Sequence, residues 1–252
     1  MSEANVLVSI DEGVATITLN RPRARNALSA EMVRALQEEL EGLRAPGDIR
    51  CCVLTGAGTA FCAGADLRQR MTMTPEEVET HTGSIRHCAD MLEELPFPVV
   101  AAVNGPAFAG GMELAIACDI RIASSRASFS LSEVKLGIFP GAGGPIRLSK
   151  LIGPGWARLM VFEGEAIQAE EALRIGLVQR LAAEGDLMGE ALRIARNIAA
   201  HDPAGVRAAK DLMNRSDALS YEEAVRLSDS LRAPLNRAAR WQEGLRKPGE
   251  QG

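Results

Sequence analysis

Two carboxylates, Glu113 and Glu133, stand where the sequence could support acid–base chemistry. Glu113 lies among the apolar residues 112–117, and an ionised carboxylate is costly to bury there unless it has a partner or a function. Glu133 comes shortly before the glycine-rich segment 140–144. Two carboxylates beside one substrate can act as a general acid and a general base.

Each glutamate also has a purely structural explanation. Glu113 could form a buried ion pair with an arginine such as Arg121, and Glu133 could pair at the surface with Lys135 or Arg147. Such pairs are common and contribute little to stability at the surface. They do not explain why glycine-rich helix starts stand beside both carboxylates, so the pattern favours an acid–base pair next to an oxyanion pocket.

Two runs of small residues could present backbone N–H groups to a ligand. Gly110 and Gly111 precede an apolar helix predicted at 112–118, so the free N–H groups and the positive dipole end of that helix would face the ligand. Segment 61–67, Phe-Cys-Ala-Gly-Ala-Asp-Leu, lies between a predicted strand and a predicted helix. Small residues let its N–H groups face outward, although a tight strand-to-helix turn would need them as well.

Other chemistries lack the residues they need. His81 and His87 are predicted on the polar face of a helix and His201 before a helix start, and none stands in a nucleophile context. The sequence has no GxSxG or GxxxxGK[ST] motif, and the glycines at 56 and 58 lack the third glycine of a dinucleotide fingerprint. The five cysteines form no CxxC or Cys/His cluster, so we predict neither disulfides nor a metal site.

The composition is that of an ordinary globular protein. The chain has 252 residues, of which 46% are hydrophobic and 24% charged. Its net charge of −5 gives no general attraction for nucleic acid. No apolar run approaches the ~18 residues that a membrane helix needs, and residues 1–13 lack the features of a signal peptide. We therefore expect a cytoplasmic protein without nucleic-acid or membrane partners.

Alternating strands and helices are predicted to position these groups. The apolar spacing after Gly153 is helical almost throughout, with helices at 187–198, 206–213 and 219–231. The expected fold class is α/β, with a core over 1–195 and a helical region over 196–252. The earlier elements are a hairpin at 6–19, a helix capped by Ser29, a strand at 51–54, a helix from the Thr74 capping box to before Pro96, a strand at 98–103, the helix at 112–118 and a strand at 120–122.

Six segments of the chain, taken together, resemble the enoyl-CoA hydratase/isomerase family, also called the crotonase superfamily. They occur in the order and with the spacing of that family, and the resemblance covers nearly the whole chain up to about residue 215. The resemblance implies a ClpP/crotonase spiral fold of ββα units with a helical C-terminal region that forms homotrimers or homohexamers. The six segments are 20–28, 61–67, 98–105, 110–113, 118–119 and 136–144.

The resemblance also implies an acyl-CoA substrate. Its thioester carbonyl would lie between the backbone N–H groups of Ala65 and Gly110, and residues 68–95 would line part of the acyl pocket. The adenine of CoA would lie near Leu67, with Arg23 or Arg25 toward the phosphates. The CoA-binding residues implied in this way are Arg23, Arg25, Ala63, Ala65, Asp66, Leu67 and Gly110.

Both glutamates match positions that family hydratases use. Water held between them would add to C3 of a trans-2-enoyl-CoA, with Glu133 supplying the proton to C2 and Glu113 activating the water. The N–H of Gly141, expected at the head of the following helix, would help to place that water. The resemblance thus implies a hydro-lyase of fatty-acid and lipid metabolism that needs no metal and meets coenzyme A only as part of its substrate.

The sequence departs from the family pattern in places. Ala109 stands where a third glycine is frequent, Pro145-Ile146 where threonine and glutamine are usual, and the tail after Gly244 is short. Residues 68–90, expected to set acyl-chain selectivity, match no motif. The alternatives are methylglutaconyl-CoA hydration, enoyl-CoA isomerisation, thioester hydrolysis, or a non-catalytic acyl-CoA or protein-binding role. The paired glutamates favour hydration.

Overall fold

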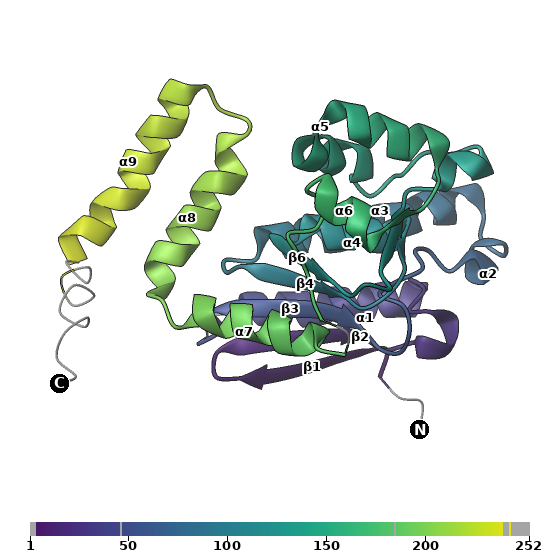
Figure 1. Ribbon diagram of the computed structural model, residues 1–252, viewed down its shortest axis with the longest axis horizontal. Coiled ribbons are helices and arrows are strands. Elements are labelled where there is room, and N and C mark those ends of the chain that lie inside the picture. The colour runs from purple at the N-terminus through teal and green to yellow at the C-terminus, as the bar shows by residue number, and fades with distance from the viewer. Residues whose placement is uncertain (1–3, 46, 184, 239–241, 243–252) are drawn as a thin grey trace. The chain divides into compact units, whose positions relative to one another are not determined.

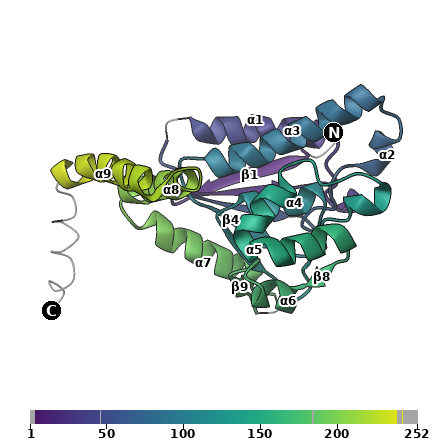
Figure 2. The same ribbon diagram turned by 90° about the horizontal axis from the view of Figure 1, so that it is seen from above.

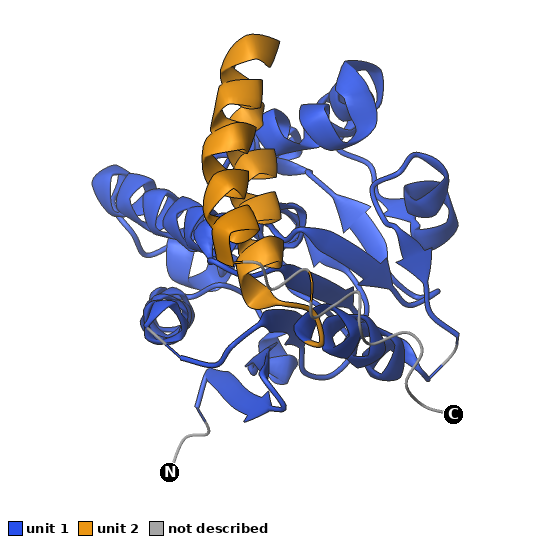
Figure 3. Ribbon diagram, turned by 90° about the vertical axis from the view of Figure 1, so that its left-hand side faces the viewer, with its two compact units in different colours: residues 1–199 blue, residues 200–252 orange. Residues whose placement is uncertain are grey.

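The computed structural model describes residues 4–45, 47–183, 185–238 and 242. The chain divides into two compact units, residues 1–199 and 200–252 (Figure 3). A boundary after residue 195 would cut helix α7 (Leu187–Ala199), whose last turn remains buried in the core of the first unit.

A six-stranded sheet forms the centre of the first unit (Figure 1). Its first two strands form the expected antiparallel hairpin, and every other neighbouring pair of strands is parallel. The hairpin turns at Glu12-Gly13, both with positive φ (48° and 78°), as a type I′ turn requires. The strands in sheet order are β1 (Val6–Asp11), β2 (Val14–Leu19), β3 (Cys51–Gly56), β4 (Val99–Val103), β6 (Ile120–Ala123) and β9 (Arg180–Leu181).

Both faces of this sheet are covered by helices, which explains the continuous apolar runs of its parallel strands. Cys51 and Val53 of β3 face the core that α7 closes, while Cys52 and Leu54 face the opposite core. That opposite core includes the apolar stripes of α1 (Ala30–Arg44) and α3 (Pro75–Glu94). Figure 2 shows α1 and α3 on one side of the sheet and α7 on the other.

Helices α1 and α3 begin where their capping residues predict, whereas α4 begins at Gly110, two residues before the predicted start. Ser29 accepts a hydrogen bond from the N–H of Met32, and Thr74 and Glu77 form the complete capping box of α3. Helix α3 ends at Glu94, before Pro96, as expected. These caps fix the residue at which each of the two helices begins.

A small second sheet supports the helix that carries Glu113. The backbone N–H of Ala109 donates to Ser130 of that sheet at 2.8 Å, and every residue of helix α4 is buried. This sheet contains β5 (Ala107–Phe108), β7 (Ser128–Ser130) and β8 (Ile167–Gln168), and α4 spans Gly110–Ala117. The other elements of the first unit are η1 (Pro22–Ala24), α2 (Leu67–Arg70), η2 (Glu133–Leu136), α5 (Gly144–Glu163) and α6 (Ala169–Arg174).

The second unit contains α8 (Pro203–Ser216) and α9 (Tyr221–Ala238), two helices that the sequence predicts. Asp202 caps α8 through the N–H of Ala204, and Pro203 begins the helix. No helix in the described part of the chain is long and apolar enough to cross a membrane. The short tail after Gly244 lies outside the described residues.

Candidate active site

Glu113 is held by the backbone of a neighbouring loop. Its side chain is 2% exposed, and its Oε1 accepts hydrogen bonds from the N–H groups of Ala142 at 2.7 Å and Gly144 at 2.8 Å. Burial raises the pKa of this carboxyl above its ordinary value, while the two N–H groups act in the opposite direction. Glu113 therefore has one oxygen fixed and the other available for a substrate or a water.

Glu133 lies at the start of η2, which follows β7 of the small sheet. It is 9% exposed, and its Oε2 has no hydrogen-bond partner among the described residues. Burial raises the pKa of Glu133 to about 7, and the charge of nearby Glu113 adds to the rise. Near neutral pH this carboxyl can therefore hold a proton and release it.

The ion pairs that could have explained the two glutamates are absent from the described residues. Arg121 is buried and donates to backbone carbonyls, among them that of Cys118 at 2.6 Å. Lys135 pairs with Glu165 at 2.7 Å, and Arg147 pairs with two carboxylates of α3. The structural explanations weighed from the sequence are wrong for both glutamates.

Two backbone N–H groups lie close together in front of helix α4. Leu28 forms a parallel bridge with Ala65, receiving the N–H of Asp66 at 3.1 Å and donating to Gly64 at 2.8 Å. Within the described residues, neither the N–H of Ala65 nor that of Gly110 has an acceptor. A Cβ placed on Gly110 would be 3.9 Å from the Ala65 nitrogen. The structure thus brings both sequence-predicted donors together.

Helix α3 forms the wall beside these donors. A Cβ placed on Gly110 would be 3.3 Å from Cγ2 of Ile85, and one on Gly141 would be 2.6 Å from Cγ2 of Thr82. The solvated position predicted for His81 is wrong, because His81 precedes Ile85 by one helical turn and shares its buried stripe. His81 is 5% exposed, whereas His87 is exposed as expected.

Gly141 does not lie at the head of a helix, which corrects the prediction. Helix α5 begins three residues later, at Gly144. The loop donors that reach the carboxylate belong to Ala142 and Gly144, which bind Glu113. The close approach of Thr82 leaves no room for a side chain at Gly141, so glycine is needed there for packing.

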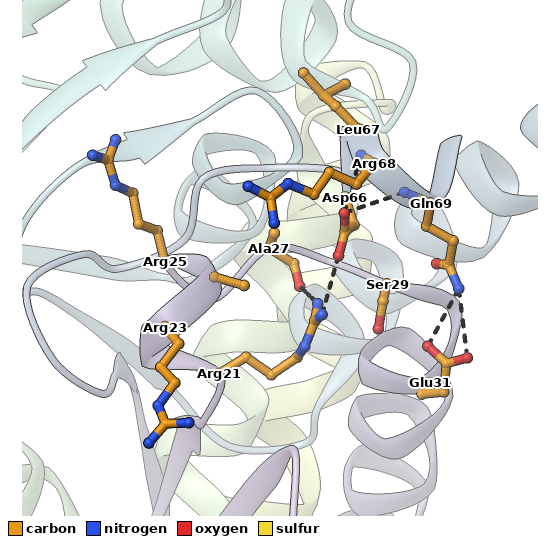
Figure 4. A pocket seen from close by; sticks show the side chains of 11 residues that line it. Arg21, Arg23, Arg25, Ala27, Ser29, Glu31, Asp66, Leu67, Arg68 and Gln69 are labelled. Carbon is orange, nitrogen blue, oxygen red and sulfur yellow. Dashed lines mark hydrogen bonds and ion pairs between the residues drawn. The ribbon is translucent and has the colours of Figure 1, made fainter. Parts of the chain in front are cut away.

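A second site, here called the arginine pocket, lies beside α2 and has a volume of about 610 Å³. Figure 4 shows Arg21 turned toward Asp66, which it contacts at 3.1 Å. Arg23 and Arg25 have no ion pair among the described residues, so their charges are available to an anion. The pocket is lined by Arg21, Arg23, Ala24, Arg25, Ala27, Ser29, Glu31, Asp66, Leu67, Arg68 and Gln69.

The arginine pocket contains four of the residues expected to bind CoA, namely Arg23, Arg25, Asp66 and Leu67. Ala63, Ala65 and Gly110 lie outside its lining. Ala63 donates its N–H to the carbonyl of Arg25 at 3.0 Å and so connects the pocket to the segment that bears the Ala65 donor. The carboxylate of Asp66 caps α2 and binds Arg21, which makes it a support for the pocket wall.

Asn26 fixes the loop that carries the two arginines. Its buried Nδ2 lies 2.9 Å from the carbonyl oxygen of Ala57, 2.8 Å from that of Ala60 and 3.2 Å from that of Phe61. Asn26 and the preceding Arg25 both adopt left-handed φ values, 56° and 52°. These contacts compensate for the unusual backbone and hold the arginine side of the pocket in place.

Sequence reasoning missed one further charged group, Arg70 at the end of α2. Its Nη2 donates to Oγ1 of Thr82 at 2.6 Å, while its buried Nε has no partner among the described residues. The available signal was its place in the segment that the resemblance assigned to the acyl pocket. Among the described residues, no group of three His, Cys, Asp or Glu side chains could hold a metal ion.

Known proteins resemble this chain over most of its length. The sequence profile described as Enoyl-CoA hydratase/isomerase matches residues 9–251. The short-chain-enoyl-CoA hydratase of Clostridium acetobutylicum is 41% identical and aligns over 88% of this chain and 85% of its own. The 2,3-dehydroadipyl-CoA hydratase of Escherichia coli is 37% identical over 89% and 87% of the two chains.

A solved structure shares the fold as well. The crystal structure of enoyl-CoA hydratase from Bacillus anthracis has a TM-score of 0.94 and 38% identity, covering 96% of this chain and 95% of its own. The mixed α/β architecture expected from the resemblance is therefore confirmed.

Proposed function

The chain belongs to the enoyl-CoA hydratase/isomerase family, and we propose that it works as an enoyl-CoA hydratase with Glu113 and Glu133 as its acid–base pair. The reaction adds water reversibly across the C2=C3 bond of a trans-2-enoyl-CoA, which makes the enzyme a hydro-lyase. One observation carries the assignment of the pair: two buried glutamates lie close together, and neither has an ion pair among the described residues.

The N–H groups of Ala65 and Gly110 would form the oxyanion hole. Addition of water at C3 moves negative charge onto the thioester oxygen, and two donors without other acceptors can bind that oxygen. The donor at Gly110 also stands at the N-terminus of α4, where the helix dipole favours negative charge. Loss of one such donor elsewhere costs about 3–4 kcal/mol of transition-state stabilisation.

The two carboxyl groups would divide the proton transfers. Ala142 and Gly144 hold Oε1 of Glu113, so its Oε2 can take a proton from the water as the oxygen bonds to C3. Glu133, protonated near neutral pH, would give its proton to C2. A proton then has to pass from Glu113 back to Glu133 before the next turnover.

Coenzyme A would enter only as part of the substrate, with its phosphates in the arginine pocket. Arg23, Arg25 and Arg68 line that pocket and lack ion pairs among the described residues. Phosphate groups are recognised well by guanidinium groups, which present several donors in a plane. The reaction draws its acid and base from the two glutamates and needs no further cofactor.

A homotrimer or homohexamer is the assembly we propose. Large apolar side chains are exposed on η2, on α5 and on the loop between them, including Phe139, Ile146 and Phe162. Met213 and Tyr221 are exposed on or near the helices of the second unit. Exposed apolar surface of this kind marks protein interfaces. Sedimentation equilibrium would show a mass of three or six chains, and a monomer at micromolar concentration would contradict the proposal.

A cytoplasmic location is part of the proposal. All five cysteines are free and buried, which suits a reducing compartment.

Incubation with crotonyl-CoA tests the proposed activity. Hydration removes the conjugated double bond, so the absorbance of the thioester falls while mass spectrometry shows the gain of one water. Free CoA would instead indicate thioester hydrolysis, and a 3-enoyl product would indicate isomerisation. Binding of crotonyl-CoA and other 2-enoyl-CoA thioesters without any turnover would overturn the proposal in favour of a binding role.

A further inference from the structure

Arg147 lies in the first turn of α5 and connects this turn to α3. Its side chain is 14% exposed, and its Nη2 lies 2.7 Å from a carboxylate oxygen of Asp90 and 2.7 Å from one of Glu93. Its Nη1 donates to the carbonyl oxygen of Ala142 at 3.1 Å. A cation in the first turn of a helix opposes the helix dipole, so this charge does not favour α5. Its contacts outside α5 are therefore the reason for its position.

These contacts hold the loop that binds Glu113. The carbonyl group of Ala142 belongs to the peptide unit between the two N–H groups that donate to Glu113, those of Ala142 and Gly144. A side chain at Gly143 would collide with Nη1 of Arg147, so the guanidinium lies directly against this stretch of backbone. Arg147 thus fixes the segment that in turn fixes Oε1 of Glu113.

The same loop has a second support on α3. Cγ2 of Thr82 would lie 2.6 Å from a Cβ placed on Gly141. Thr82 precedes Asp90 by eight residues, which is about 12 Å along a helix. Packing against Thr82 limits how closely the loop can approach α3, and the hydrogen bond from Arg147 to Ala142 fixes its orientation. The loop is therefore held against α3 at two separate points.

Arg147 also acts on Glu113 through its charge. Burial raises the pKa of Glu113, whereas the two loop N–H groups, Arg147 and Arg70 lower it. The carboxyl of Glu133 is the third titratable group within electrostatic reach of Glu113. Arg147 therefore supports the ionised form of Glu113, which the proposed reaction needs as its base.

We propose that Arg147 is a positioning residue for the hydration reaction, which holds Glu113 at a fixed place relative to α3 through the backbone of Ala142 and Gly144. The inference rests on the proposed hydratase function. A planar guanidinium can bind two carboxylates and a carbonyl oxygen at the same time, whereas the ammonium group of a lysine is a single point charge. The base and the α3 wall of the acyl site then keep one relative position during turnover.

Three variants test the role of the guanidinium. Arg147→Met should lower kcat for crotonyl-CoA by about 10²-fold and change KM by less than about threefold, because a small displacement of a catalytic group costs that much. Arg147→Lys keeps the charge without the planar fork and should recover at most about tenfold of this loss. Arg158→Met removes an exposed arginine of α5 and should change neither constant. A wild-type kcat in either variant of Arg147 would overturn the positioning role.

A charge-balanced variant separates positioning from stability. Arg147→Met leaves two like charges, Asp90 and Glu93, without the cation between them, and so lowers the stability of the fold. The triple variant Arg147→Met/Asp90→Asn/Glu93→Gln removes these charges as well. Its Tm should lie closer to that of the wild type than the Tm of Arg147→Met, while its kcat should stay as low. Recovery of kcat together with Tm would show that Arg147 only stabilises the fold.

A titration of Glu113 keeps this inference apart from the proposed reaction. Infrared spectra of the protein without substrate report protonated carboxyl groups, and the difference from Glu113→Gln assigns the band of Glu113. Its pKa should be higher in Arg147→Met than in the wild type, because the ionised form loses a nearby cation and its fixed N–H donors. The acidic limb of kcat/KM should move to higher pH in the same variant.

The two failures can be told apart. An unchanged pKa of Glu113 in Arg147→Met would overturn this inference, whatever the hydratase activity. A wild-type protein that hydrates no 2-enoyl-CoA would overturn the proposed function, while a raised pKa of Glu113 in the variant would still support the link from Arg147 to Glu113.

Discussion

The carboxylate pair and the arginine pocket use charge in opposite ways. Glu113 and Glu133 are nearly inaccessible to solvent, and one is held by backbone N–H groups while the other has an unpartnered oxygen. In the arginine pocket, by contrast, the side chains of Arg23, Arg25 and Arg68 are exposed to solvent. A charge in a dry site interacts strongly with its few neighbours, whereas a charge in a wet site interacts weakly with many partners.

The difference shows why only one of the two regions can do proton chemistry. Burial raises the pKa of Glu133 to about 7, close to the pH at which an acid catalyst is most useful. The arginines remain charged at any physiological pH, so they attract a substrate without exchanging protons with it. Changes to the carboxylate pair should therefore affect kcat, and changes to the arginine pocket should affect KM.

The largest effect is expected from removing either carboxylate. Glu113→Gln and Glu133→Gln should each lower kcat for crotonyl-CoA by about 10²–10⁴-fold, because general acid–base catalysis contributes that much. Binding of a saturated acyl-CoA, measured by calorimetry, should change little because neither residue lines the arginine pocket. A variant that keeps more than a tenth of the wild-type kcat would remove its glutamate from the mechanism.

A smaller effect is expected when Glu113 is displaced and not removed. A Cβ at residue 144 would lie 2.9 Å from Oε1 of Glu113, so Gly144→Ala should move the carboxylate and cost about 10²-fold in kcat. Gly155→Ala provides the control on the same helix, because nothing lies within 4 Å of a Cβ there. Similar kinetics for the two variants would show that the position of Glu113 is not critical.

The pH dependence of kcat/KM should follow the protonation of Glu133. Its protonated form is the donor, so kcat/KM should fall about tenfold per pH unit above 7, and a rate profile flat from pH 6 to 9 would contradict this role.

The free energy of unfolding should also depend on pH through the carboxyl group of Glu133. The folded pKa of about 7 exceeds the ordinary 4.5, so stability from the protonated form is present below pH 4.5 and is lost as the pH rises through 7. Urea unfolding at pH 5 and at pH 8 gives the free energy of unfolding of Glu133→Gln relative to that of the wild type. This difference should shift in favour of the variant by up to roughly 3 kcal/mol between the two pH values.

The smallest effects belong to the arginine pocket. Arg23→Ala and Arg25→Ala should each raise KM for crotonyl-CoA by about two- to fivefold with kcat unchanged, since exposed ion pairs contribute at most about 1 kcal/mol. The increase should shrink at high salt, which screens exposed charges. Arg126→Ala, in an exposed turn, is the matched control. A fall in kcat in either pocket variant would erase the contrast between the two regions.

Local signals in the sequence were sufficient for much of the fold. The Ser29 cap, the Thr74 capping box and the hairpin at 6–19 depend on neighbouring residues, so the structure has them where the sequence predicts. The buried position of Glu113 followed from its apolar neighbours, and the family resemblance supplied the pairing with Glu133.

Contacts between distant segments could not be predicted in the same way. Nothing near Glu113 in the chain reveals that the N–H groups of Ala142 and Gly144 bind it, because any residue type carries such a group. The orientation of the Arg70 side chain depends on its hydrogen bond to Thr82, which lies in another helix. The burial of His81 could have been read from its spacing of four residues to Ile85, yet its polarity suggested the solvent face.

The side chain of Asn26 has a consequence for motion. The loop that bears Arg23 and Arg25 cannot leave segment 57–61 unless all three contacts of the Asn26 amide break together. Amide protons of the two segments should therefore exchange with deuterium in one concerted opening, at a rate well below that of ordinary surface loops. Coenzyme A would then bind to and dissociate from an arginine pocket whose loop stays rigid during turnover.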